Sequence, residues 1–297
     1  MRLKKTLMQR KNLLNYLYIA PMLLLFAAFI VFPIIYNIRI SFYDWNGISR
    51  QMKPAGLQNY KALLGDPVLI RILINFLIFS FATIIIQGML GMIFASLIHG
   101  GLKLSGLYRT LIYLPMVATP TIVGSVFSKI LETNKGSLNE MLRSLHLDSL
   151  ALPWLALPGT ALMWIVIVNI WQWTGYSMLV YYTAMLNIST EIYEAADIDG
   201  AGRVQRFFVI TFPMLRSAHF TVFIMGMIGA LKTFDIPYVL TGGGPNHATE
   251  FFSTYINRLA FEDFDQGRGS ALVIIMLVIA MIITAVQLWI YYDQEKE

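Results

Sequence analysis

Six long stretches of this chain are apolar and nearly free of charge, and they restrict its fold more than any other feature. A helix needs about 20 such residues to cross ~30 Å of hydrocarbon at ~1.5 Å per residue. An uninterrupted helix satisfies its own backbone hydrogen bonds in lipid, and the alternating pattern of a membrane β-barrel is absent. The sequence therefore predicts an all-α, polytopic membrane protein with about six transmembrane helices. We place the spans at about 12–38, 72–98, 108–130, 159–186, 216–240 and 269–292, in a single transmembrane domain over residues 1–297.

The composition supports a membrane location and excludes several classes of function. Hydrophobic residues make up 57% of the chain and charged residues 13%, against about 45–50% and about 25% in soluble domains. The net charge of +5 is modest and the basic residues are scattered, so we expect contact with a lipid bilayer and no binding of nucleic acid. The chain has no cysteine, and its four histidines are far apart in sequence. We therefore expect no catalytic residues, no metal site and no enzymatic activity.

The start of the chain carries dense positive charge. Its first eleven positions contain five basic residues and no acidic residue, which favours a cytoplasmic N-terminus. Six spans would then return the C-terminus to the cytoplasm. The uncharged run that follows is much longer than the ~7–15 apolar residues of a signal peptide, so we interpret it as a membrane anchor.

The most informative polar segment lies between the fourth and fifth spans, at residues 188–215. Ser189 or Thr190 can cap a helix that begins with Glu191 and Glu194. Gly200 and Gly202 permit a sharp change of direction, and Pro213 limits a second short helix. The pattern predicts a helix–turn–helix on the cytoplasmic surface. Two interpretations are open: a surface helix that anchors the loop to the membrane, or a helix presented to a groove on a soluble partner.

This segment resembles the EAA loop of binding-protein-dependent ABC importer permeases. The matching residues are Glu194-Ala195-Ala196, Asp199-Gly200-Ala201, Phe207, Ile210 and Pro213. A second stretch is similar to the carbohydrate subfamily, which contains the maltose and glycerol-phosphate permeases: Phe234-Asp235, then Tyr238-Val239-Leu240-Thr241-Gly242-Gly243-Gly244-Pro245. Pro21, Pro33 and Ser41-Phe42 also fit, so the resemblance extends over almost the whole chain. One departure is Ser217, where many relatives have a second proline, and it leaves the approach angle of the fifth helix open.

The resemblance implies the type I ABC importer permease fold and a set of partners. Such a chain forms half of a carbohydrate pore in the inner (plasma) membrane of a bacterium or archaeon, beside a second homologous permease. Two ATPase subunits bind ATP and Mg²⁺, and an extracellular solute-binding protein delivers the sugar. In this chain the resemblance assigns ATPase coupling to Glu194, Ala195, Ala196, Asp199, Gly200, Phe207 and Pro213, and binding-protein contact to Thr241, Gly242, Gly243, Gly244 and Pro245. The sequence agrees with ATP binding by a partner, since it contains no G-x-x-x-x-G-K-[ST] phosphate loop. We expect no cofactor in this chain.

The fourth span offers a candidate substrate path. Asn169, Gln172, Trp173 and Tyr176 are three, four and seven positions apart, which predicts one helix face. Polar groups in a span normally face protein or water, and aromatic rings with amides suit sugars. The alternative is that this face packs against the partner permease. We place Tyr181 and Tyr182 in an aromatic belt at the membrane interface.

Lys232 and Asp235 lie three residues apart in the fifth span, where they can form a structural ion pair or serve as a gate. Two rival functions lack their sequence signals. A secondary transporter would show duplicated halves or broken helices around an ion site, and a membrane-embedded enzyme would need a histidine or carboxylate cluster at the ends of its spans. The sequence does not name the sugar.

Overall fold

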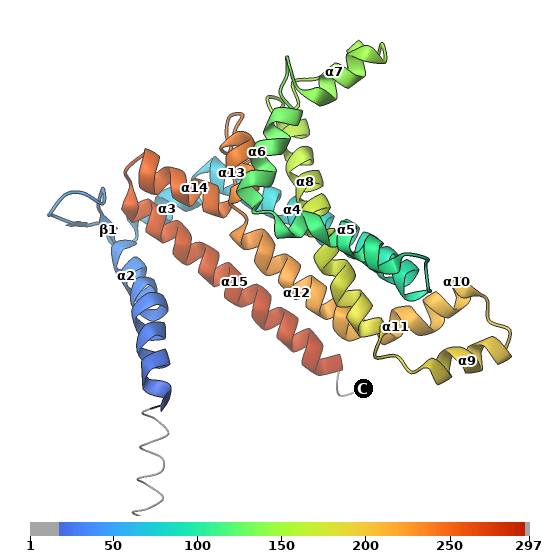
Figure 1. Cartoon of the computed structure of the whole chain (residues 1–297). Helices are drawn as coiled ribbons and strands as arrows, with labels where there is room; N and C mark the ends of the chain where they lie inside the picture. The colour runs from blue at the N-terminus through green and yellow to red at the C-terminus, as the bar shows by residue number, and fades with distance from the viewer. Residues whose placement is uncertain (1–17, 295–297) are drawn as a thin grey trace, which may run out of the picture. The chain divides into compact units, whose positions relative to one another are not determined.

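The structure is a computed structural model that describes residues 18–294, with side chains to residue 290. The five N-terminal basic residues and the first part of the span predicted at 12–38 lie outside the described residues. Most of the described chain is helical (Figure 1), which confirms the all-α prediction. The elements in chain order are η1 (Ala27–Val31), α2 (Phe32–Ile40), β1 (Tyr43–Asp44), β2 (Lys53–Pro54), α3 (Gln58–Leu64), α4 (Pro67–His99), α5 (Ser105–Val117), α6 (Pro120–Ile130), α7 (Ser137–Ser144), η2 (Asp148–Leu150), α8 (Pro158–Met185), α9 (Thr190–Ile198), α10 (Arg203–Arg206), η3 (Phe207–Thr211), α11 (Phe212–Met214), α12 (Arg216–Lys232), α13 (Asp235–Thr241), α14 (Phe252–Asn257), η4 (Arg258–Glu262) and α15 (Gln266–Gln294).

The chain divides into two compact units, a division that the sequence does not predict. Among the described residues, unit 1 contains residues 18–65 and 256–275, and unit 2 contains residues 66–255 and 276–294. Within unit 1, the two short strands pair antiparallel, with Tyr43 opposite Pro54. The side-chain amide of Asn59 donates hydrogen bonds of 2.9 Å to the carbonyl oxygens of Ser41 and Tyr43. These bonds join α3 to the turn that follows α2.

Three helices among the described residues are long and apolar enough to cross a membrane: Tyr18–Ile40, Pro67–His99 and Gln266–Ile290. Two bent pairs of shorter helices pass the same test together, so by this measure the number of spans reaches five. The chain is therefore a multi-pass membrane protein. Helix α8 falls outside this count, although its 28 residues extend over ~42 Å. Its asparagine, glutamine and tryptophan side chains lower its mean hydropathy.

The span predicted at 108–130 is broken. It consists of α5 and α6, which meet at an angle of 92°. Thr119 has extended backbone angles (φ −63°, ψ 139°), because a following proline disfavours the helical conformation of the residue before it. Pro120 then starts α6 at its first position, where a missing N–H costs nothing.

The span predicted at 216–240 is broken as well. Helix α12 ends at Lys232, and α13 starts after two non-helical residues. The ring of a proline inside a helix collides with the carbonyl group four residues earlier. Pro237 would meet the carbonyl of Thr233 in this way, which explains the position of the break.

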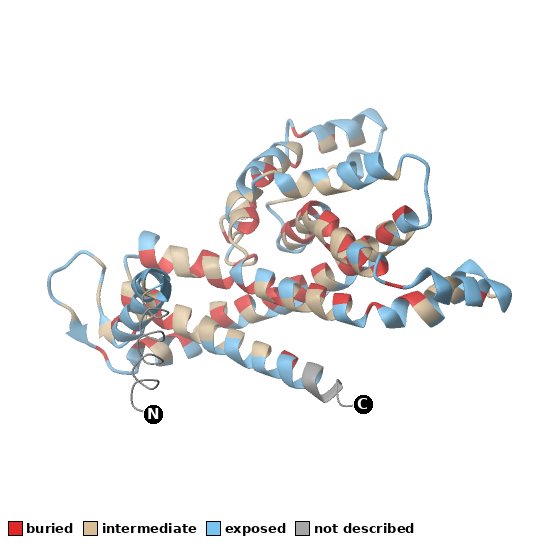
Figure 2. Cartoon of the chain, turned by 60° about the horizontal axis from the view of Figure 1, so that its bottom comes forward, coloured by how far each residue is buried: buried red, intermediate tan, exposed pale blue. Residues whose placement is uncertain are grey.

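Helix α8 packs closely against α4 and α5 in unit 2. A Cβ atom at Gly91 of α4 would lie 2.6 Å from Cβ of Ser177, and one at Gly175 would lie 2.5 Å from the carbonyl oxygen of Ile112 in α5. Small residues allow helix backbones in membranes to approach this closely. In contrast to this interior, α9 and α10 are mostly exposed (Figure 2).

Candidate functional site

A cavity of about 420 Å³ lies in unit 2 between α4, α8 and α12. Its volume is in the range of about 300–1,000 Å³ that is usual for small-molecule sites. Asn169, Trp173 and Tyr176 of α8 line it, so three of the four residues predicted for a substrate path are brought together. All three side chains are half-buried.

Gln172 does not line this cavity. Its side chain is fully buried, and its Nε2 donates a 2.9 Å hydrogen bond to the carbonyl oxygen of Ala118, between α5 and α6. Successive residues of a helix point about 100° apart, so Gln172 lies at one edge of the predicted face and Trp173 at the other. Gln172 therefore supports the bend between α5 and α6.

The cavity combines ring faces with hydrogen-bonding groups. Phe79 and Phe234 line it together with the tryptophan and tyrosine of α8. Gln87 and Ser177 contribute an amide and a hydroxyl, joined by a 3.1 Å hydrogen bond. Apolar ring faces and paired donors and acceptors suit a polyhydroxylated ligand. Sequence reasoning missed Gln87, although a polar residue inside an apolar span is itself a signal.

Lys232 and Asp235 also line the cavity, but they form no ion pair within 4.0 Å in the described part of the chain. The carboxylate of Asp235 instead accepts a 2.8 Å hydrogen bond from the hydroxyl of Thr121 on α6. Of the two alternatives for Lys232 and Asp235, the structural ion pair is therefore not formed. An ion pair between residues three apart requires one continuous helix, whereas the break after α12 separates Lys232 from Asp235.

Residues 190–214, here called the EAA segment, form the predicted helix–turn–helix. The hydroxyl of Ser189 caps α9 by accepting a 3.3 Å hydrogen bond from the amide of Glu191. Gly200 makes the turn with φ +75°, a conformation that glycine adopts without steric cost. Arg206 pairs with Asp197 across this turn.

Most residues assigned to ATPase coupling lie on the surface of the EAA segment. Five of them are exposed: Glu194, Ala195, Asp199, Gly200 and Pro213. Phe207 is half-buried and Ala196 is buried. Large apolar side chains are also exposed, among them Ile198 at 87% and Val204 at 72%. Such a surface is typical of a segment that contacts another protein or a membrane.

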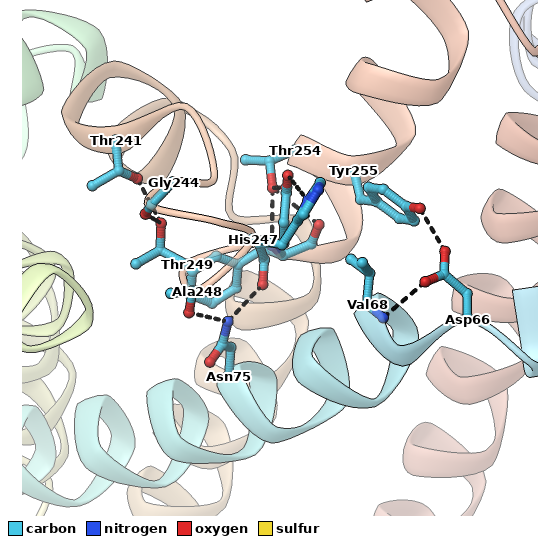
Figure 3. A network of polar contacts seen from close by, with 12 residues as sticks. Asp66, Val68, Asn75, Thr241, Gly244, His247, Ala248, Thr249, Thr254 and Tyr255 are labelled. Carbon is cyan, nitrogen blue, oxygen red and sulfur yellow. Dashed lines mark hydrogen bonds and ion pairs between the residues drawn. The ribbon is translucent and has the colours of Figure 1, made fainter. Parts of the chain in front are cut away.

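Residues 241–250, here called the glycine loop, are held by a network of polar contacts (Figure 3). The side-chain amide of Asn75 on α4 donates 2.9 Å hydrogen bonds to the carbonyl oxygens of Ala248 and Glu250. The buried carboxylate of Glu250 accepts from Thr254 at 2.6 Å and lies 3.2 Å from Nδ1 of His247. This network makes the loop a rigid element of unit 2.

The residues predicted for binding-protein contact in the glycine loop are mostly turned inward. Thr241, Gly242, Gly244 and Pro245 are half-buried, and Gly243 is buried. Thr241 lies 2.7 Å from Thr249, hydroxyl to hydroxyl. The exposed tip is Asn246, which the sequence reasoning did not select. The roles of Asn75 and Glu250 were also missed, because neither residue belongs to the motif.

Tyr181 does not lie in an aromatic belt. It is 4% exposed and belongs to a core of nine buried residues from α4, α8, α12 and the adjoining turns. Tyr182 is half-buried, and the guanidinium carbon of Arg109 lies 5.7 Å from its ring centroid.

The chain is similar to known transport proteins along most of its length. Residues 87–293 match the family model described as "Binding-protein-dependent transport system inner membrane component". The chain is 33% identical to "Probable ABC transporter permease protein YurN" of Bacillus subtilis, over 98% of this chain and 100% of that protein. It is also 33% identical to the "Trehalose/maltose transport system permease protein MalF" of Thermococcus litoralis, over 96% of both chains. The "Lactose transport system permease protein LacF" of Rhizobium radiobacter is 33% identical, over 89% of this chain and 90% of that one.

Two solved structures share the fold. One chain of a bacterial ABC transporter involved in the import of the acidic polysaccharide alginate superimposes with a TM-score of 0.84, at 23% identity and 99% coverage of both chains. A chain from the alginate transporter in complex with its alginate-bound periplasmic protein gives a TM-score of 0.80 at 24% identity, covering 94% of this chain and 93% of that one. The predicted importer permease fold is confirmed.

Proposed function

Because this chain belongs to the family of binding-protein-dependent transport system inner membrane components, we propose that it is the permease subunit of an ATP-driven ABC importer for a carbohydrate. It forms half of the translocation pore. The observation that carries the substrate class is the cavity of unit 2, where Trp173 and Tyr176 offer ring faces beside the amide of Asn169. The sugar names of several relatives support the same class.

The proposed partners follow from what this chain contains and lacks. A second homologous permease completes the pore. Two ATPase subunits bind ATP and Mg²⁺, since this chain has no phosphate-loop motif. The EAA segment docks onto an ATPase, with Glu194 as an exposed charge and Gly200 at the turn. An extracellular solute-binding protein contacts the glycine loop around Asn246.

This assignment of partners also orients the chain. The EAA segment must face the cytoplasm to meet an ATPase, whereas the glycine loop faces outward. With α8, α12 and the bent pair α5–α6 counted as spans beside the three long helices, the chain crosses the membrane six times. Both termini then lie in the cytoplasm, in agreement with the positive charge at the start of the chain.

Uptake by the complete importer in proteoliposomes tests the proposal. The permease pair, the ATPase and the solute-binding protein are assayed with lactose, trehalose, maltose, maltodextrin and a uronate oligosaccharide. ATP-dependent uptake of at least one sugar is expected. Trp173→Ala should lower that uptake about tenfold, because ring stacking in the cavity is lost.

Trp171→Ala is the matched control. Trp171 is on the same helix but is 48% exposed and packs against Phe127 outside the cavity. Its removal should change uptake less than about twofold, in the range of ordinary surface substitutions. Equal losses in the two variants would contradict the cavity as the substrate path, and no uptake of any sugar by the unmodified complex would contradict the substrate class.

A further inference from the structure

The EAA segment meets α12 at a sharp bend. The helical stretches on either side, Arg203–Met214 and Arg216–Lys232, are inclined by 65°. His219 lies in the first turn of α12, directly after this bend. Its Nε2 is 3.0 Å from the carbonyl oxygen of Phe212 in the EAA segment, and its Nδ1 is 3.0 Å from the hydroxyl of Tyr181 on α8. One side chain therefore connects three elements of unit 2.

The chemistry of the two partners determines where the protons lie. A carbonyl oxygen only accepts hydrogen bonds, so Nε2 of His219 carries the proton and donates to Phe212. In the neutral imidazole, Nδ1 is then an acceptor, and the hydroxyl of Tyr181 donates to it. A single tautomer of the uncharged ring satisfies both bonds. The two hydrogen bonds therefore run in one direction: the hydroxyl of Tyr181 on α8 donates to His219, and His219 donates to the backbone of the EAA segment.

Packing holds the ring of His219 in place. Its centroid lies 4.6 Å from the ring of Phe212 and 5.3 Å from the ring of Tyr181. Leu215, at the bend, and Ala218, in the first turn of α12, are 1% and 5% exposed and belong to the same buried core as Tyr181. A side chain in contact with two rings and joined to two hydrogen-bond partners transmits a displacement of its neighbours better than a mobile one.

Both ends of this contact lie close to the cavity. Ser177 is one turn before Tyr181 on α8, and Val222 is one turn after His219 on α12. Both line the cavity. Residues three or four apart share a helix face, so a shift of the EAA segment that moves His219 also moves residues on the cavity wall.

We infer that His219 is a positioning residue for transport: it ties the end of the EAA segment to α8, so that movement of the docked segment reaches the cavity. This inference rests on the proposed coupling function. It adds a specific link that lies outside the EAA motif. The hydrogen bond to Phe212 also sets the approach angle of α12, at a place where Ser217 provides no proline to do so.

Three variants separate the two hydrogen bonds in the assembled importer in proteoliposomes. The measurement is the number of sugar molecules imported per ATP hydrolysed, counted per assembled complex. His219→Leu removes both bonds and should lower this ratio about threefold to tenfold. Tyr181→Phe removes only the bond to α8 and should lower it about twofold to fivefold. His219→Gln retains an N–H donor for Phe212 and should recover the part of the His219→Leu loss that the bond to Phe212 accounts for.

Tyr182→Phe is the control, because it removes a neighbouring hydroxyl that forms no hydrogen bond with any of the described residues. It should leave the ratio unchanged. The double variant with His219→Leu and Tyr181→Phe should be no worse than His219→Leu alone, since the two residues share one interaction.

Two results would overturn the inference. A Tyr181→Phe ratio equal to that of the unmodified complex would show that the link carries no coupling, and this test does not depend on whether His219→Leu assembles. Losses of assembled complex with an unchanged ratio would reduce His219 to a structural role. Failure of the proposed function would be seen separately, as absence of ATP-driven uptake by the unmodified complex.

Discussion

Two glycine turns of this chain have similar positive φ angles in opposite surroundings. Gly200 of the EAA segment has φ +75°, and Gly243 of the glycine loop has φ +85°. A Cβ atom at Gly200 would meet nothing within 4 Å, whereas one at Gly243 would overlap the carboxylate of Glu250. The space beside Gly200 is open, whereas the space beside Gly243 is filled by the side chain of Glu250.

The difference separates two reasons for keeping a glycine. At Gly200 only the backbone requires it, and the open space is available to a partner. At Gly243 the backbone and the packing both require it, because Glu250 occupies the position of a side chain and is held there by Thr254. A glycine motif in a sequence therefore does not by itself mark a contact surface. Exposure separates the two cases.

The largest effect is expected from Gly243→Ala. We expect it to lower the free energy of unfolding by ~2–5 kcal/mol, because unfavourable backbone strain adds to overpacking against the Glu250 carboxylate. Thermal unfolding of the purified chain in detergent measures the change. Gly242→Ala is the matched control, since Gly242 also has positive φ but its nearest contact for a Cβ is at 4.0 Å. Equal destabilisation by the two variants would remove the packing argument.

An intermediate effect is expected from Glu194→Lys, and it should appear in partner binding only. Glu194 is exposed on α9, so the stability of the chain should not change. Under the proposed docking of the EAA segment onto an ATPase, reversal of this charge should weaken binding about 30-fold to 100-fold. Titration of the purified permease pair with the ATPase measures this affinity. Glu140→Lys, at an exposed site on α7, is the control that should bind normally; unchanged affinity of Glu194→Lys would leave the EAA segment as a membrane-surface anchor.

The smallest effect is expected from Gly200→Ala. The methyl group has free space, so only the positive φ is penalised, by about 1 kcal/mol in unfolding free energy. The same thermal assay that is used for Gly243→Ala gives a direct comparison of one substitution at two sites. A loss at Gly200 as large as the loss at Gly243 would show that the EAA turn is packed by the chain itself, and the contrast between the two turns would then fail.

Local features of the sequence predicted a large share of the fold. The apolar runs at 72–98 and 269–292 lie within the helices Pro67–His99 and Gln266–Gln294. The sequence also predicted a helix that starts at Ser189 or Thr190 and a turn at Gly200 and Gly202, because caps and turns depend on neighbouring residues. The structure selects Ser189 as the cap and gives Gly200 the positive φ. The break at Thr233 was missed, although Pro237 predicts it, because a proline ring collides with the carbonyl group four residues earlier.

What the sequence could not decide is which side chains meet across the fold. Spacing placed Gln172 beside Asn169, but the packing of α8 turned Gln172 toward Ala118. Asp235 bonds to Thr121, which is 114 residues away in the chain, and His219 reaches Tyr181 on another helix. The membrane determines how long and how apolar each helix must be, and a sequence displays both properties. The rotation of each helix about its own axis is determined by the close packing of its neighbours, and that packing exists only in the folded chain.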